Sequence, residues 1–292
     1  MHTSIIHSQN SANYVTWLRS DFPLLYQTKI ENMTFTEILE ERLEKDDILW
    51  RYIDLHTLLS FAHTRELNFT RLDKYSDPFE GVTMAYLKDR GVINLEITNP
   101  EIPEEVRAHQ KKRKETEGPR IEKESLEKQQ TQFASSWIRS NRESMAMWNI
   151  YSNADSVALK INGRALIDYL EKNLELNAHL MPKNKFLTGN ISYFRLNPLD
   201  RFENPKLGPY SAFKKDVCYS FENEYRLLIV TPIGKAKENP ERLGLPITKN
   251  LFELITVVYH PQMEPWKKAN IANVCEVFGF KKPENAATEI RL

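Results

Sequence analysis

The most suggestive group of polar residues lies in one segment late in the chain, residues 221–229, which reads FENEYRLLI. Because side chains alternate between the two faces of a strand, Glu222, Glu224 and Arg226 would share one face. A carboxylate on a rigid strand beside a cation can bind a ribose diol or stabilise a developing positive charge. The pattern also fits an exposed cross-strand charge pair, which contributes only about 0–1 kcal/mol. The opposite face would carry core residues, namely Phe221, Tyr225, Leu227 and Ile229.

A second candidate is a stripe of side chains at helical spacing, formed by Ser144, Trp148 and Tyr151. Aromatic rings in such a stripe can stack on a nicotinamide or adenine ring, although a stripe of this kind more often belongs to the core. The spacing predicts a helix over residues 140–151. Ser140 and Glu143 would form the capping box that opens it.

Two further segments contain charged residues in positions that suggest binding. Asp77 and Glu80, in the sequence DPFE, could bind a ribose or a metal ion. The same four residues are typical of a helix start, with aspartate as N-cap and proline at the first helical position, and Gly91 would end that helix. Arg51 lies in an apolar strand and therefore needs a partner, which is either an anionic ligand or an internal carboxylate such as Glu224.

The histidines and cysteines form no recognisable metal or nucleophile motif. His56 and His63 are seven residues apart, which is too far for the i, i+4 metal pair of a helix. Cys218 and Cys275 belong to no CxxC pair or Cys/His cluster, and two lone cysteines are typical of a reducing compartment. The sequence has no HExxH or GxSxG motif and no glycine-rich phosphate loop. We therefore predict neither a metal site nor a Ser-His-Asp triad.

Composition places the chain among cytoplasmic globular proteins. Hydrophobic residues make up 41% of the 292 residues, which is enough for a substantial core. Lys and Arg number 40, as do Asp and Glu, so no overall charge attracts nucleic acid or anionic lipid. The N-terminal segment lacks the pattern of a signal peptide, and no stretch approaches the roughly 18 apolar residues of a membrane helix. We expect a cytoplasmic protein without a membrane partner.

Strands and helices mix in the sequence without a regular βαβ rhythm, which predicts an α+β fold with a mixed or antiparallel central sheet and flanking helices. We expect a small helical N-terminal extension over residues 1–46, including a helix that a capping box opens at Thr34, and a main domain over 47–292. Strands are expected at 48–53, 67–70, 132–138, 156–161, 189–194, 221–231 and 254–260, and further helices at 55–64, 164–174 and 264–278.

A charged insertion interrupts the main domain at about residues 101–130. It contains eight acidic and eight basic residues. The pattern predicts a solvated helix broken at Gly118-Pro119, or a mobile excursion. Such an insertion can also carry a binding surface for a protein partner.

Three motifs in this order, DPFE at 77–80, MWxxY at 147–151 and ExEYR at 222–226, resemble a bacterial family catalogued as domain of unknown function twenty-nine seventy-one. The resemblance covers about residues 48–280. The family usually has Asn where this chain has Ser76, and Gly where it has His260; neither position is a charged site candidate.

A looser likeness is to ADP-ribosyltransferases, which place an Arg or His on a first strand, a Ser or Tyr on a middle strand and a catalytic Glu on a late strand. Arg51, Ser135 or Ser136, and Glu224 follow that order. The likeness implies that Glu224 and Arg51 are catalytic and that NAD is the cofactor. The residues expected to bind the cofactor are Tyr52, Ser135, Ser136, Trp148, Tyr151, Glu222, Arg226, Asp77 and Glu80.

Three classes of function stay open at this point. The first is a nucleotide-handling enzyme, most concretely an ADP-ribosyltransferase-like protein that uses NAD, in a toxin or phage-defence setting, with a protein or nucleic acid as acceptor. The second is a non-catalytic binding module that recruits a partner through residues 101–130. The third is an enzyme acting on nucleic acid, with a basic track formed by Lys111, Lys112, Arg113, Lys114, Lys183, Lys185, Lys214 and Lys215.

Overall fold

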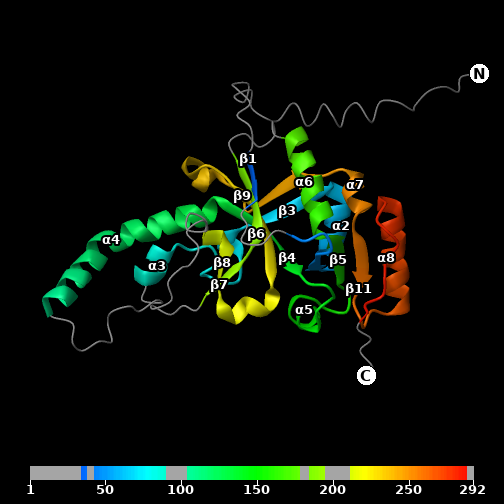
Figure 1. Cartoon of the computed structure of the whole chain (residues 1–292), viewed down its shortest axis with the longest axis horizontal. Helices are drawn as coiled ribbons and strands as arrows, with labels where there is room; N and C mark the ends of the chain where they lie inside the picture. The colour runs from blue at the N-terminus through cyan, green and yellow to red at the C-terminus, as the bar shows by residue number, and fades with distance from the viewer. Residues whose placement is uncertain (1–33, 38–42, 90–103, 178–183, 195–210, 288–292) are drawn as a thin grey trace, which may run out of the picture.

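A nine-stranded sheet, mostly antiparallel, organises the part of the chain that the computed structural model describes, which is residues 34–37, 43–89, 104–177, 184–194 and 211–287 (Figure 1). The strands of its main path, in spatial order, are β1 (Thr34–Glu37), β6 (Lys185–Asn190), β9 (Glu224–Val230), β4 (Gln132–Arg139), β2 (Ile48–Ile53), β5 (Val157–Asn162) and β11 (Thr256–Tyr259). β3 (Glu66–Arg71) pairs with β4 and with β10 (Arg242–Pro246). Only β1 runs parallel to its neighbour in this sheet. The predicted α+β class is confirmed.

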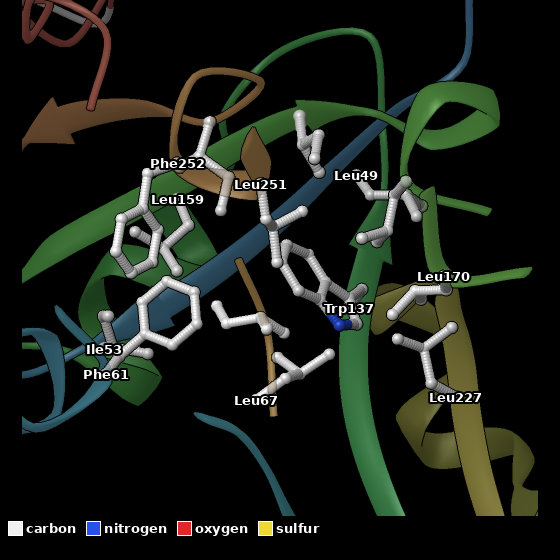
Figure 2. Close-up of a cluster of buried hydrophobic side chains, with 14 of the residues drawn as sticks. Leu49, Ile53, Phe61, Leu67, Trp137, Leu159, Leu170, Leu227, Leu251 and Phe252 are labelled. Atoms are coloured by element: carbon white, nitrogen blue, oxygen red, sulfur yellow. The ribbon is translucent and has the colours of Figure 1, made fainter. Parts of the chain in front are cut away.

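One face of the sheet carries the main hydrophobic core, drawn in Figure 2. Four helices contribute buried side chains to it: α2 (Leu55–Thr64), α6 (Gly163–Asn177), α7 (Lys249–Phe252) and α8 (Pro265–Phe278). Alternate residues of the strands point into this core, such as Trp137 of β4 and Leu227 of β9. Burial of each large apolar side chain contributes about 1.5–3 kcal/mol, so this face dominates the stability of the fold.

The opposite face carries two smaller apolar groups with polar residues between them. Ala134 and Leu228 belong to the first group, while Ile138 packs against the second, around Trp148 of helix α5 (Met145–Tyr151). Between Ala134 and Ile138 on the same face of β4 lies Ser136, whose backbone partner on β9 is Arg226. The polar residues of the site therefore interrupt this face of the sheet.

Shorter elements cover the polar region of this face. They are α3 (Met84–Asp89), the 3-10 helices η2 (Leu72–Lys74), η5 (Ser211–Phe213) and η6 (Val217–Glu222), and a separate parallel pair formed by β7 (Ser192–Phe194) and β8 (Lys214–Asp216). The strand predicted over 189–194 is thus two strands, because β6 ends at Asn190 and β7 starts a second sheet. A further 3-10 helix, η7 (Ile233–Glu238), follows β9.

The predicted N-terminal helix is wrong where the structure describes it. Thr34–Glu37 forms β1, whose backbone pairs with Lys185 to Thr188 of β6. The capping-box spacing that predicted a helix is a local signal, and pairing with the sheet edge overrides it. The rest of the predicted extension, residues 1–33 and 38–42, lies outside the described residues.

Two predicted helix starts are also corrected. Residues 78–81 form a turn and α3 begins only at Met84; Asp77 caps the turn, since its Oδ1 accepts a hydrogen bond of 2.8 Å from the Phe79 amide. Gly81 ends the turn with φ of +70°, and a Cβ there would lie 2.3 Å from Leu72 Cδ1.

Helix α5 begins after Ser144 rather than Ser140, because Ser144 caps the Met147 amide. The predicted stop at Gly91 lies outside the described residues.

The charged insertion is a single long helix, α4 (Glu104–Gln130), that continues through Pro119 instead of breaking there. Its second half packs on the domain and buries Ser125 and Gln129. Figure 1 shows its first half extending away from the sheet. Residues 101–103 lie outside the described part. None of the described helices combines the length and the apolar character needed to cross a membrane.

Candidate functional site

The acidic segment that the sequence singles out bends at Asn223. β9 begins at Glu224, whereas Glu222 is the last residue of η6. Asn223 has a φ of +43°, a conformation that Asn tolerates better than most residues, and its side-chain amide donates a 2.6 Å hydrogen bond to the Arg139 carbonyl. The predicted continuous strand over 221–231 is therefore wrong at its start, and Phe221 is 50% exposed instead of reaching the core.

Five charged side chains meet beside this bend. We call them the ion cluster: Glu80, Lys215, Glu222, Glu224 and Arg226. Lys215 Nζ lies 2.6 Å from Glu222 Oε2, 3.1 Å from Glu224 Oε2 and 3.8 Å from Glu80 Oε2. Three carboxylates thus share one ammonium group, although Glu80 comes from a segment far from Glu222 and Glu224 in the sequence.

Arg226 joins two of these carboxylates from the other side. Its Nε donates to Glu224 Oε1 at 2.7 Å, and its Nη1 donates to Glu80 Oε1 at 2.6 Å and to the Ala212 carbonyl. All three glutamates are buried and Arg226 has no exposed surface. Charges can be buried in this way only when they are paired, because each loses its hydration. Three carboxylates against two cations give the cluster one net negative charge when all are ionised.

The two glutamates bound to Arg226 have pKa values shifted in opposite directions. Burial opposes ionisation of Glu224, but the charges of Arg226 and Lys215 outweigh it and lower its pKa to about 2. Burial raises the pKa of Glu80, and Arg226 offsets only part of that effect, while the neighbouring Glu224 adds to it. Two adjacent carboxyl groups with separated pKa values form the arrangement that supports acid–base chemistry.

Tyrosines surround the ion cluster. The Tyr75 ring centroid lies 5.8 Å from the Arg226 guanidinium, and the Tyr193 hydroxyl accepts a 2.8 Å hydrogen bond from the Glu224 amide. Tyr151, at the end of α5, donates its hydroxyl to Glu222 Oε1. Burial raises the pKa of Tyr193 to about 12, so its hydroxyl stays protonated at neutral pH. Of the three tyrosines, Tyr151 contacts a carboxylate of the cluster directly, Tyr193 contacts the Glu224 backbone and Tyr75 packs beside the Arg226 guanidinium.

Three buried atoms of the ion cluster have no hydrogen-bond partner among the described residues: Glu80 Oε2, Glu224 Oε2 and Arg226 Nη2. Two of these atoms still form ion pairs with Lys215 Nζ, Glu224 Oε2 at 3.1 Å and Glu80 Oε2 at 3.8 Å. Most buried polar atoms in proteins are satisfied, and an unsatisfied one costs about 1–3 kcal/mol. Atoms left in this state beside a cavity are candidates for contacts with a ligand.

A cavity of about 220 Å³ adjoins the ion cluster. Glu80 and Lys215 are the two cluster residues that line it. Its other walls come from the turn after η2, from α3 and from the segment of β8 and η6, with the residues Asp77, Phe79, Val82, Leu87, Lys214, Asp216, Cys218 and Tyr219. The ion cluster and this cavity together form the candidate site.

Arg51 and Ser135 lie on the other face of the sheet. Arg51 Nη1 donates to Ser135 Oγ at 2.9 Å, and its guanidinium lies 5.8 Å from the Trp137 ring centroid in the main core. Ser136 faces the ion cluster, because it is opposite Arg226 in the β4–β9 register. Glu224 is paired with Arg226 and not with Arg51, so the predicted constellation of Arg51, Ser135 or Ser136, and Glu224 is not assembled.

The predicted aromatic stripe separates into two parts. Trp148 is 1% exposed and donates its Nε1 hydrogen to Glu143 at 3.1 Å, so it belongs to the core. Tyr52 packs edge-on against Trp148 and its hydroxyl accepts from the Ser144 amide. Only Tyr151, which is 48% exposed, reaches the site, because α5 ends there. Trp148 and Tyr52 are therefore not placed to stack on a cofactor.

Sequence reasoning did not assign Lys215, Tyr75 or Tyr193 to the site. Lys215 was counted in a basic track, but its ammonium group is turned into the ion cluster and pairs with carboxylates. The only sequence signal for it was the Lys214-Lys215 pair before the acidic motif. Lys183 of the proposed track lies outside the described residues.

The described residues contain no group of three His, Cys, Asp or Glu side chains arranged to hold a metal ion. Cys218 lines the cavity, but its hydrogen bond with Asp216 raises the pKa of the thiol, which disfavours the thiolate that nucleophilic attack requires.

Comparisons of the chain with family models, with curated proteins and with solved structures gave no match. The resemblance to the bacterial family and the likeness to ADP-ribosyltransferases both stay predictions.

Proposed function

We propose that this protein is a nucleotide-handling enzyme that cleaves the bond between ribose and nicotinamide in NAD, with the ion cluster and its cavity as the active site. The observation that carries the proposal is the position of Glu80. It is a buried carboxyl group with a raised pKa, at the junction of the ion cluster and the cavity. Its Oε2 has no hydrogen-bond partner among the described residues and only a 3.8 Å ion pair to Lys215. Such perturbed carboxyl groups beside a cavity are typical of catalytic sites.

The reaction makes two demands that the cluster can meet. As the bond to C1′ of the ribose breaks, its electron pair leaves with nicotinamide, which departs as a neutral ring, and positive charge develops on the ribose. The ionised Glu224, whose pKa is about 2, stabilises this charge through its field in a site from which water is largely excluded. An acceptor hydroxyl then bonds to C1′, and its proton passes to Glu80 acting as base.

Arg226 and Lys215 serve this chemistry by position and not by contact with the reacting bond. They hold the Glu80 and Glu224 carboxylates within one buried group and keep Glu224 ionised. The role that the likeness to ADP-ribosyltransferases implied for Arg51 is not retained here, since Arg51 bonds to Ser135 on the other face.

The test is to incubate the purified protein with NAD and to measure released nicotinamide by chromatography. We expect cleavage by the wild type and a loss of at least about 100-fold in kcat for both Glu80→Gln and Glu224→Gln, as is typical when a general base or a charge-stabilising group is removed. Glu284→Gln is the matched control, because Glu284 forms an exposed ion pair with Lys160. Its kcat should not change.

Melting temperatures of the variants separate loss of catalysis from loss of folding. The proposal fails if the wild type leaves NAD intact. It also fails if the folded Glu80→Gln and Glu224→Gln variants cleave NAD as fast as Glu284→Gln does.

A further inference from the structure

Two segments of the cavity wall share the same local structure. Asp77 Oδ1 accepts a 2.8 Å hydrogen bond from the Phe79 amide, and Asp216 Oδ1 accepts a 2.8 Å hydrogen bond from the Cys218 amide. Each aspartate thereby closes a turn that places an aromatic ring, Phe79 or Tyr219, in the cavity wall. Phe79 is 41% exposed, although a ring of this size usually finds apolar cover.

The charge around the cavity is negative. Lys215, which lines the cavity, is already neutralised by the glutamates of the ion cluster, and its ammonium lies 5.0 Å from the Tyr219 ring centroid. Asp77 and Tyr219 line the same cavity, and the field of the Asp77 carboxylate raises the pKa of the Tyr219 hydroxyl. Cavity and cluster together hold five carboxylates and three cations: Asp77, Glu80, Asp216, Glu222 and Glu224 against Lys214, Lys215 and Arg226.

A second feature, independent of the charge count, supports a ligand in the cavity. Glu80 is 2% exposed and its Oε2 lacks a hydrogen-bond partner, while the residue itself lines the cavity. At about 30 Å³ per water molecule, the cavity has room for about seven waters, or for one substituted six-membered ring.

We propose that this cavity binds an organic cation of the size of a substituted pyridinium ring, held by the faces of Phe79 and Tyr219 and by the carboxylates of Asp77 and Glu80. Aromatic faces with nearby carboxylates are the usual means by which proteins recognise such cations. The inference deepens the proposed function and rests on it for the identity of the ligand, since the oxidised nicotinamide ring is a cation of this kind. Binding itself requires no catalysis.

The experiment compares two probes that differ in charge, 1-methylnicotinamide, which is a cation, and nicotinamide, which is neutral. Titration calorimetry on the full chain should give an affinity about tenfold higher for the cation than for nicotinamide. Added salt should lower the affinity for the cation only. Equal affinities for the two probes, or no binding of 1-methylnicotinamide at millimolar concentration, would overturn the proposal.

Variants locate the binding. Asp77→Asn keeps an oxygen that can cap the Phe79 turn but removes the charge. The affinity for 1-methylnicotinamide should therefore fall about fivefold, and the affinity for nicotinamide should not change. Phe79→Ala should lower the affinity for both probes. Asp155→Asn is the matched control, because Asp155 pairs with Lys267 on α8, away from the cavity. An Asp77→Asn variant that binds 1-methylnicotinamide as tightly as the control does would contradict the assignment.

The two proposals fail in different ways. If 1-methylnicotinamide binds with the expected preference but NAD is not cleaved, the cation site stands and the proposed function falls. If NAD is cleaved but the two probes bind equally, the function stands and the cation site is wrong.

Discussion

The two faces of the central sheet differ in what they do with the same strands. On the face covered by α2, α6 and α8, β4 and β9 contribute Trp137, Leu227 and Ile229 to a continuous apolar core. On the other face the same two strands contribute Ser136 and Arg226 to a region where charges interrupt the apolar groups. Because neighbouring residues of a strand point to opposite faces, a residue of the apolar core and a residue of the charged region stand next to each other in the sequence.

The energetic consequence is that the two faces respond differently to substitution. The core face gains free energy from each apolar side chain that it buries. The ion cluster contributes little net stability, since the cost of removing five charges from water offsets their attraction, and it becomes strongly unfavourable when one partner is lost. Stability is therefore concentrated on one face, and the groups suited to binding and reaction on the other.

The largest effect on stability should come from breaking the ion cluster. Arg226→Met leaves the buried Glu80 and Glu224 carboxylates without their shared cation, so we expect a loss of about 3–5 kcal/mol in the free energy of unfolding, measured by urea denaturation. Leu227→Ala on the core face should cost a similar amount, about 2–5 kcal/mol, through the cavity that it creates. Only Arg226→Met should change the pH dependence of stability, and an identical pH profile for both variants would remove the distinction between the faces.

A smaller effect should appear in acid. The pKa of Glu224 is about 2 in the folded protein, against an ordinary value of 4.5 that applies when the chain unfolds. A lowered pKa stabilises the fold above pH 4.5, and this contribution disappears as the pH falls from 4.5 toward about 2. The raised pKa of Glu80 acts in the opposite sense, since its contribution is present in acid and is lost as the pH rises through its folded-state value.

Melting temperatures of the wild type and of Glu224→Gln, measured from pH 5 downward, test the sign. The wild type should lose stability more steeply than the variant. A variant that loses stability as steeply as the wild type does would show that Glu224 is not held ionised.

The smallest effect should come from Tyr151→Phe. This change removes the hydroxyl that donates to Glu222 while it keeps the half-exposed ring, so we expect a loss of about 1 kcal/mol or less in stability. If Tyr151 helps to orient the ion cluster for reaction, the kcat for NAD should fall by more than the KM changes. Tyr169→Phe is a suitable control, because the Tyr169 hydroxyl accepts from the Thr248 amide at an exposed site on α6.

Much of the fold could be predicted from the sequence, because the relevant signals are local. Apolar residues at strand spacing predicted β2, and those at helical spacing predicted α2, each with the observed bounds. The alternation of Glu224, Tyr225 and Arg226 between the two faces was also confirmed. Local signals misled where two of them looked equivalent in the sequence, as with Ser140 and Ser144, of which only Ser144 caps α5.

The composition of the site could not be predicted to the same degree, because it depends on which distant segments pair. Arg51 and Arg226 are both arginines in apolar strands, and only the register of β2, β4 and β9 decides which of them lies beside Glu224. Lys215 belongs to a three-residue strand with no periodicity that would mark it. Asn223 also had to adopt a positive φ before Glu222 could join the cluster.

That single backbone conformation has a consequence for any attempt to redesign the protein. In an ideal strand the Cα atoms of residues 222 and 224 would lie about 6.6–6.8 Å apart, with both side chains standing roughly parallel. The irregular joint at Asn223 frees Glu222 from this spacing and lets both carboxylates converge on the same nitrogen of Lys215, at 2.6 and 3.1 Å. A backbone idealised to remove the irregularity would keep every charged residue of this segment and would still disperse the group that they form.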